Sequence, residues 1–203
     1  VSFLKGERVL ADFETTVDLK IDGFIPATYI TNEFEKLNMY KKISAITTAE
    51  DLEDIRNELE DRFGEIPEVT ENLLKVALLK AKAHAVYITE ISGSRSEYKI
   101  SMFKTAPIDT YKMFGFLKEY NDGKKTEVLK NRTAGYVGAG GRRGTSEQIL
   151  RFVADSQPYF VFRPPNPPKT IDQMQEVLSE FFDGLSELIL DAETIQNQEE
   201  KRA

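Results

Sequence analysis

The sequence predicts an α+β fold, in which a helical amino-terminal half precedes a smaller half that contains a sheet. Three helical periods in succession, within about residues 31–85, predict a three-helix unit. Two segments of strand character, 86–91 and 97–103, flank a short polar turn and predict a β-hairpin. The clearest helical period of the chain follows Thr170 and predicts a long amphipathic helix near the carboxyl end.

A strand is expected ahead of the three helices. Residues 17–25 alternate between apolar and polar side chains, and Pro26 ends this pattern because proline lacks the N–H that a sheet requires. Residues 1–16 show no clear period and are interpreted as a linker from a preceding domain. The folded domain is therefore expected to span residues 17–190, followed by a polar tail over residues 191–203.

Local capping signals delimit the helices of the three-helix unit. The first helix is expected to begin at Thr31 or Asn32, and its recurring apolar side chains are Phe34, Leu37, Tyr40 and Ile43. The second is expected to begin in a capping box at Thr47 or Thr48, and its apolar stripe is Leu52, Ile55, Leu59 and Phe63. The third, over residues 67–85, has a wide apolar arc and is predicted to form the buried centre of the unit.

The second half, about residues 86–190, is predicted to form a small mixed or antiparallel sheet with helices. After the hairpin, the expected elements are a helix over 107–120, a strand over 126–131, a short helix over 148–154, a strand over 159–163 and the final amphipathic helix. Residues 133–146 hold five of the twelve glycines and are interpreted as a flexible loop. A proline-rich segment over 164–168 closes the last strand.

Composition excludes several classes of site. The chain has no cysteine, which excludes disulfides and thiolate chemistry and fits a cytoplasmic location. His84 is the single histidine, so a histidine-rich metal centre is impossible, and this residue is interpreted as a partly buried structural one. No apolar run approaches the roughly 20 residues that span a bilayer, so no membrane association is expected.

The negative charge of the chain is concentrated in one stretch. The net charge is −7, and residues 50–71 hold ten acidic and two basic side chains, whereas the remainder is close to neutral. This distribution argues against broad nucleic-acid binding, which needs a basic surface, and it suits a basic protein partner. A solvated helix face is the simpler alternative, and it stays open at this point.

Four of these acids share one face of the second helix, because Asp51, Asp54, Glu58 and Asp61 recur at intervals of three and four residues. Stacked like charges weaken a helix by about 0.2–0.5 kcal/mol per pair, and a basic partner would relieve this repulsion. Arginine suits such a face best, because its planar fork binds a carboxylate through two hydrogen bonds.

Two alternative functions rest on basic residues of the second half. The glycine-rich loop, with Arg142 and Arg143, offers a phosphate-binding interpretation, although it lacks the lysine of a P-loop and has Arg143 where a dinucleotide fingerprint has glycine. A direct nucleic-acid contact would use Arg142, Arg143, Arg151, Lys124 and Lys125. Both remain alternatives to protein docking.

Four segments, in order, resemble the C-terminal domain of the bacterial transcription-repair coupling factors, the Mfd family. They are GFIPATYI at 23–30, LNMYKKISAI at 37–46, DRFGEIPEVTENLL at 61–74 and VALLKAKA at 76–83. The match covers about residues 17–90 in register, and the remainder is similar only in outline.

The resemblance implies a regulatory, protein-interaction domain that is not itself an enzyme. Members of the family are ATP-driven DNA translocases that displace stalled RNA polymerase and recruit UvrA in transcription-coupled nucleotide excision repair. Their motor domains, with the ATP and Mg sites and the DNA contacts, lie outside this domain, so no cofactor is expected here. Residues 1–16 would then be the end of the linker from the motor.

The resemblance also implies an autoinhibitory dock. In the family, this domain docks on the UvrB-like N-terminal module of the same protein and masks the surface that binds UvrA. The acidic family positions of that dock map onto Glu58 and Asp61, which would face arginines of the partner. Asp54 and Arg62 are added to the predicted binding residues from helical spacing alone.

Overall fold

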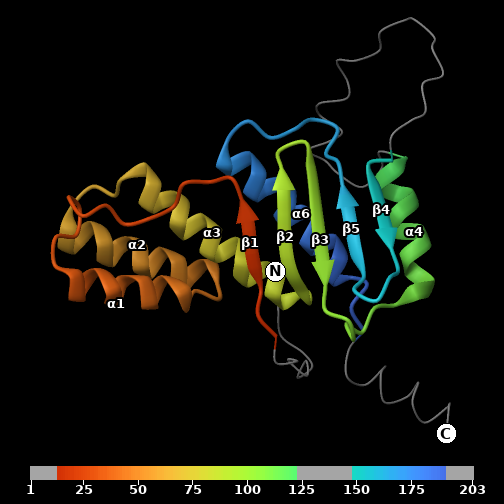
Figure 1. Cartoon of the computed structure of the whole chain (residues 1–203), viewed down its shortest axis with the longest axis horizontal. Helices are drawn as coiled ribbons and strands as arrows, with labels where there is room; N and C mark the ends of the chain where they lie inside the picture. The colour runs from red at the N-terminus through yellow and green to blue at the C-terminus, as the bar shows by residue number, and fades with distance from the viewer. Residues whose placement is uncertain (1–12, 123–147, 191–203) are drawn as a thin grey trace, which may run out of the picture.

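The computed structural model describes residues 13–122 and 148–190, and it confirms the predicted α+β class. Three helices lie beside a five-stranded sheet that is backed by further helices (Figure 1). The described elements are β1 (Thr16–Leu19), α1 (Glu33–Ser44), α2 (Ala49–Phe63), α3 (Glu68–Ala85), β2 (Ile88–Ser94), β3 (Glu97–Met102), α4 (Thr110–Asn121), β4 (Leu150–Val153), β5 (Tyr159–Phe162) and α6 (Ile171–Ser186). Among them, no helix is long and apolar enough to cross a membrane.

Four predicted segments lie wholly or mostly outside the described residues: the linker over 1–16, of which residues 13–16 are described, the strand over 126–131, the glycine-rich loop over 133–146 and the polar tail over 191–203. The phosphate-binding interpretation depended on that loop.

The sheet is mixed and has the strand order β1-β2-β3-β5-β4. β1 runs parallel to β2, and the other neighbouring strands are antiparallel. α6 and the carboxyl-terminal part of α3 lie behind the sheet in the view of Figure 1, and α4 flanks β4. Near the β2–β3 turn, Gly93 has a φ of 130°, and a Cβ there would overlap the carbonyl oxygen of Glu97, so only glycine allows this approach.

Two hydrophobic cores meet along α3. The helical core surrounds Leu59 and Leu74, whereas the sheet core surrounds Phe181. α3 serves both cores, since Leu78 belongs to the helical core and Leu79 to the sheet core. The wide apolar arc predicted for this helix is confirmed, because α3 packs against α1 and α2 as well as against the sheet and α6.

The helix starts agree with the predicted capping signals. The side chain of Asn32 accepts two N–H bonds at the start of α1, and Thr48 forms a capping box with Asp51 at the start of α2. Thr170 caps α6, and α2 ends at Gly64, where φ is positive. All of these signals involve residues that are close in sequence.

Residues 148–154, predicted as a short helix, instead contain the edge strand β4, so that prediction is wrong. Leu150 is buried and Phe152 packs against the sheet core, whereas Arg151 is exposed, as in a strand with one covered face. The side-chain amide of Asn121 closes the outer edge, donating to the carbonyl of Leu150 at 2.9 Å and accepting from its N–H at 3.1 Å.

The buried face of α1 also differs from the predicted one. Phe34 is 72% exposed and Leu37 is 53% exposed, whereas Met39 and Ile43 are buried. Only Ile43 of the predicted stripe is fully buried, because α2 and α3 pack on a face that includes Met39.

The segment that leads into α1 is only partly a strand. The predicted strand over 17–25 is confirmed for its first part alone, because the chain then leaves the sheet for the helical unit. There the N–H of Phe24 donates to the carbonyl of Val69 at 3.1 Å, and Ile25 is buried in the helical core.

Packing begins upstream of residue 17, where the linker was expected to end. Phe13 stacks on His84 and on Phe103, with ring centroids 4.3 and 4.8 Å apart. Thr15 is buried, and its hydroxyl lies 3.1 Å from Nδ1 of His84 while donating to the carbonyl of Ile88 at 2.6 Å. These contacts agree with the structural interpretation of His84.

Candidate docking surface

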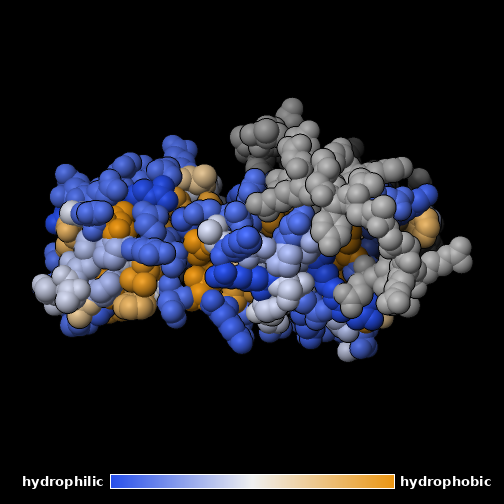
Figure 2. Space-filling view, turned by 90° about the horizontal axis from the view of Figure 1, so that it is seen from above, coloured by the Kyte–Doolittle hydropathy of each residue, from blue (hydrophilic) through white to orange (hydrophobic). Residues whose placement is uncertain are grey.

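The orientation of α2 determines which of its acids face outward. Leu52 and Leu59 are buried in the helical core, and the half-buried Ile55 and Phe63 complete the predicted apolar stripe. A bidentate ion pair from Arg56 to a glutamate of α3, at 3.0 and 3.1 Å, holds the helix against α3. The surface of the helical unit is mostly hydrophilic in the view of Figure 2, with small hydrophobic patches between.

Asp54 and Asp61 are exposed on the face of α2 that points away from the helical core. Within the described part of the chain, neither carboxylate has an ion pair or a hydrogen bond from another side chain. Both carboxylates are therefore accessible to a cation from another molecule.

Glu58 and Arg62, the other two predicted residues, are bound to each other and to α1. Glu58 accepts hydrogen bonds from Nζ of Lys42 at 2.6 and 2.7 Å and from Arg62 at 2.9 Å. Arg62 also donates to Glu35 at 2.9 Å and lies over the ring of Phe63, 4.8 Å from its centroid. The Lys42 ammonium, followed by the smaller effect of Arg62, lowers the pKa of Glu58.

Lys42 and Glu35 are site residues that the sequence did not indicate. Both lie on α1, and Lys42 is separated from Glu58 by 16 positions, so helical spacing cannot relate them. The four predicted residues thus divide into a free pair, Asp54 and Asp61, and a pair that is already engaged within the chain.

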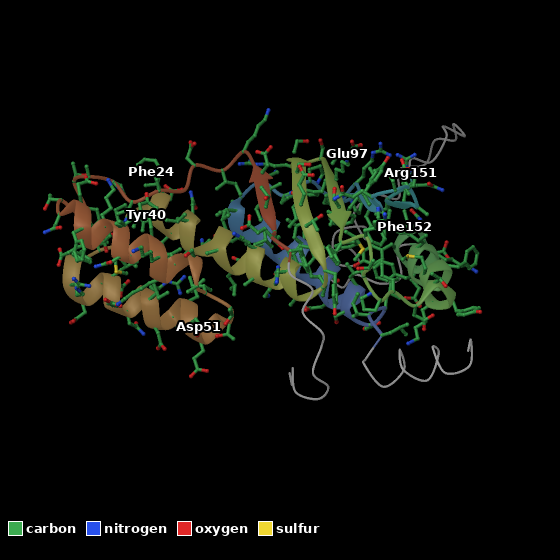
Figure 3. All side chains as sticks on the ribbon, turned by 60° about the horizontal axis from the view of Figure 1, so that its bottom comes forward. Phe24, Tyr40, Asp51, Glu97, Arg151 and Phe152 are labelled. Atoms are coloured by element: carbon green, nitrogen blue, oxygen red, sulfur yellow. The ribbon has the colours of Figure 1, made fainter. Side chains whose placement is uncertain are left out.

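Asp51 serves the helix rather than the docking face. Its carboxylate accepts from the hydroxyl and N–H of Thr47 and from the N–H of Thr48, at 2.7 to 2.9 Å. These bonds, with the Thr47 side chain first, lower its pKa from 3.8 to about 2. Figure 3 places Asp51 at one end of the helical unit.

We expect Asp51→Ala to destabilise the protein at neutral pH and to lose this effect in acid. The folded-state pKa lies below the unfolded value, so the ionised carboxylate stabilises the fold above about pH 4, and this stabilisation disappears as the pH falls through about 2. Urea unfolding of both proteins between pH 6 and 2 checks this. A difference in stability that stays constant with pH would contradict the assignment.

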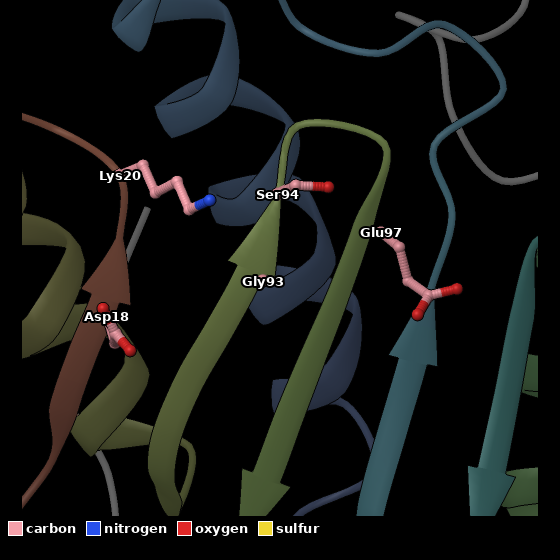
Figure 4. A pocket seen from close by; sticks show the side chains of 5 residues that line it. All are labelled: Asp18, Lys20, Gly93, Ser94 and Glu97. Carbon is pink, nitrogen blue, oxygen red and sulfur yellow. The ribbon is translucent and has the colours of Figure 1, made fainter.

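Other candidate groups lie far from α2. Arg151 is exposed on β4 and lies across the sheet from the helical unit that carries Asp51 (Figure 3). Lys124, Lys125, Arg142 and Arg143 fall outside the described residues. An open pocket of about 370 Å³ over β1, β2 and β3 is lined by Asp18, Lys20, Gly93, Ser94 and Glu97 (Figure 4). Its Glu97 is already paired with Arg163 at 2.6 Å.

Comparison with known proteins identifies a matching family. Residues 19–113 match the family model described as the TRCF domain. The transcription-repair-coupling factor of Bacillus subtilis (strain 168) is 30% identical over 143 residues, 64% of this chain and 12% of that protein. That of Borreliella burgdorferi is 38% identical over 109 residues, 53% of this chain and 10% of that protein. The chain thus matches only about a tenth of the length of these relatives.

The fold is also that of a solved relative. The crystal structure of the C-terminal domain of a transcription-repair coupling factor matches with a TM-score of 0.58 and 23% identity, over 87% of this chain and 94% of that one. Together with the matched family model, this confirms the resemblance noted in the sequence. Residues 19–113 therefore match the TRCF domain, and the chain is similar in sequence and fold to the C-terminal domains of the bacterial transcription-repair coupling factors.

Proposed function

We propose that this chain is a non-catalytic regulatory module that docks the acidic face of α2 onto an arginine-bearing surface. The observation that carries the proposal is the pair of displayed carboxylates, Asp54 and Asp61, which have no cation of their own in the described structure. Beside them, Glu58 completes an acidic patch on a helix that the helical core holds rigidly. Such a patch suits a basic partner, and the acidity is local to this region.

The partner that we propose is the UvrB-like N-terminal module of the parent transcription-repair coupling factor. In this proposal, the docked domain masks the surface that binds UvrA until the parent engages RNA polymerase. ATP hydrolysis and DNA translocation belong to motor domains elsewhere in the parent, and the whole acts in the cytoplasm. This part of the proposal is supported by the match of residues 19–113 to the TRCF domain.

The expected strength of the ion pairs between α2 and the partner is consistent with a contact that can dissociate. Exposed ion pairs contribute about 0–1 kcal/mol each, so a small number of them holds two surfaces together without making the complex permanent. A population shift of the parent on binding polymerase then needs only a modest difference in affinity.

We expect Glu58→Lys combined with Asp61→Lys to weaken binding of the UvrB-like module at least about tenfold, because both carboxylates become like charges facing arginines. Isothermal titration calorimetry of the purified chain with that module measures the change. Circular dichroism must show an unchanged fold, because Glu58→Lys also removes the internal ion pairs of Glu58 with Lys42 and Arg62.

A matched control carries the same change in charge on another helix. Glu176→Lys with Asp183→Lys alters two exposed acids of α6, away from the proposed surface. If both double variants weaken binding equally, net charge alone explains the effect, and the proposed surface is wrong. If neither does, docking does not involve these acids.

A further inference from the structure

Lys42 occupies, within the chain itself, the place that an arginine of the partner would take. Its Nζ contacts both carboxylate oxygens of Glu58, at 2.6 and 2.7 Å. A guanidinium that binds a carboxylate through two hydrogen bonds also needs both oxygens. A carboxylate offers about four lone-pair sites, and Lys42 and Arg62 already use three of them, so a bidentate guanidinium has to displace an internal hydrogen bond.

The second internal cation at Glu58 is held more firmly than Lys42. Arg62 reaches only one oxygen of Glu58 and is also fixed by Glu35, at 2.9 Å, and by its position over the ring of Phe63. For Lys42, Glu58 is the sole side-chain partner within the described part of the chain, and the lysine side chain is 48% exposed. The Lys42 ammonium is thus the group that can be displaced into solvent.

We infer that Lys42 is an internal competitor of the docking partner, so that full engagement of Glu58 requires the Lys42–Glu58 ion pair to open. This inference rests on the docking function proposed above, and it adds a regulatory element to that surface. Asp54 and Asp61 can attract the partner without breaking an internal ion pair, whereas Glu58 contributes only after its ion pair with Lys42 has opened. The dock is then weaker than its number of carboxylates implies, and it is easier to release.

Two lysine variants separate competition from a simple change in charge. Lys42→Met removes the ammonium and keeps the apolar stem, and Lys41→Met does the same at the neighbouring exposed lysine, which has no ion pair among the described residues. Both variants gain the same negative charge and the same long-range attraction to a basic partner. We expect Lys42→Met to bind the UvrB-like module with a Kd about two- to fivefold lower than that of Lys41→Met.

A double-mutant cycle localises the effect to Glu58. In a Glu58→Gln background the benefit of Lys42→Met over Lys41→Met should vanish, because there is no carboxylate left to compete for. Calorimetric titration of the complete chain with the UvrB-like module provides all of these Kd values. Thermal melts of each variant confirm that the chain is folded.

The remaining outcomes overturn the inference in distinguishable ways. Equal affinities for the Lys41 and Lys42 variants, with binding retained, show that no competition exists. Weaker binding by Lys42→Met shows instead that Lys42 positions Glu58 for the partner. If neither the wild type nor Lys42→Met binds, the docking function itself fails, and the competition fails with it.

Discussion

Replacing Phe181 by alanine should lower the free energy of unfolding by about 3–5 kcal/mol, the usual range for an aromatic side chain removed from a core. Phe181 has no exposed surface and lies at the centre of the sheet core, on the buried face of α6. Five aromatic rings surround it, with centroids 5.3 to 6.1 Å away: Phe116, Tyr120, Phe160, Phe162 and Phe182. These rings come from α4, β5 and α6. In the alanine variant they would surround a cavity, because packed helices and strands cannot move far enough to fill it.

Urea unfolding followed by circular dichroism measures this loss. Phe114→Ala is the control, because Phe114 lies on α4 but is 76% exposed and outside both cores. We expect a change for that variant within about 0.5 kcal/mol of wild type. Similar losses of unfolding free energy in both variants would contradict this assignment, because they would show that Phe114 is as well packed as Phe181.

The elements that sequence predicts best are those whose signals are local. The start of α2 follows from a capping box between Thr48 and Asp51, and its end follows from Gly64. The β2–β3 hairpin and the register of α6 are equally local, since each depends on one short turn or one unbroken period. The N-terminal capping sites of these helices therefore need no knowledge of the tertiary structure.

The elements that sequence predicts poorly depend on contacts made across the fold. β4 is a strand because it pairs with β5 along one edge, and on its other edge Asn121, 29 positions away, satisfies the backbone of Leu150. On α1, helical period alone cannot decide between the stripe with Phe34 and the one with Met39. The packing of α2 and α3 selects the second.

The candidate site shows the same division. Spacing alone placed Asp51, Asp54, Glu58 and Asp61 on one face of α2, and the structure shows Asp54 and Asp61 exposed there, whereas Asp51 and Glu58 are partly buried. Spacing did not reveal that Lys42 holds Glu58, because this ion pair joins two helices. The difference matters for function, since it separates carboxylates that are free from one that is already bound.

Leu59→Ala should lower the free energy of unfolding by about 2–5 kcal/mol through the second core. Leu59 has no exposed surface and lies between its neighbours Leu52 and Phe63 on the stripe that seats α2 in the helical core. Its carbonyl also accepts from the hydroxyl of Tyr29 at 3.1 Å, so a shift of the helix here disturbs the approach to α1. Leu37→Ala, at an exposed position of α1, is the matched control and should change stability little.

Hydrogen exchange shows whether this loss is local. Among the described elements, α3 is the one that contributes to both cores, so amides of α1 and α2 should lose protection in Leu59→Ala while those of β3 and β5 keep most of theirs. Equal loss in both cores would show that they open as one unit. A loss of protection confined to α1 and α2 would also matter for docking. Asp54, Glu58 and Asp61 lie on the same helix as Leu59, so the helical core would then determine how rigidly the acidic surface is held. A partner that binds this surface should then restore protection to α2 before any other element.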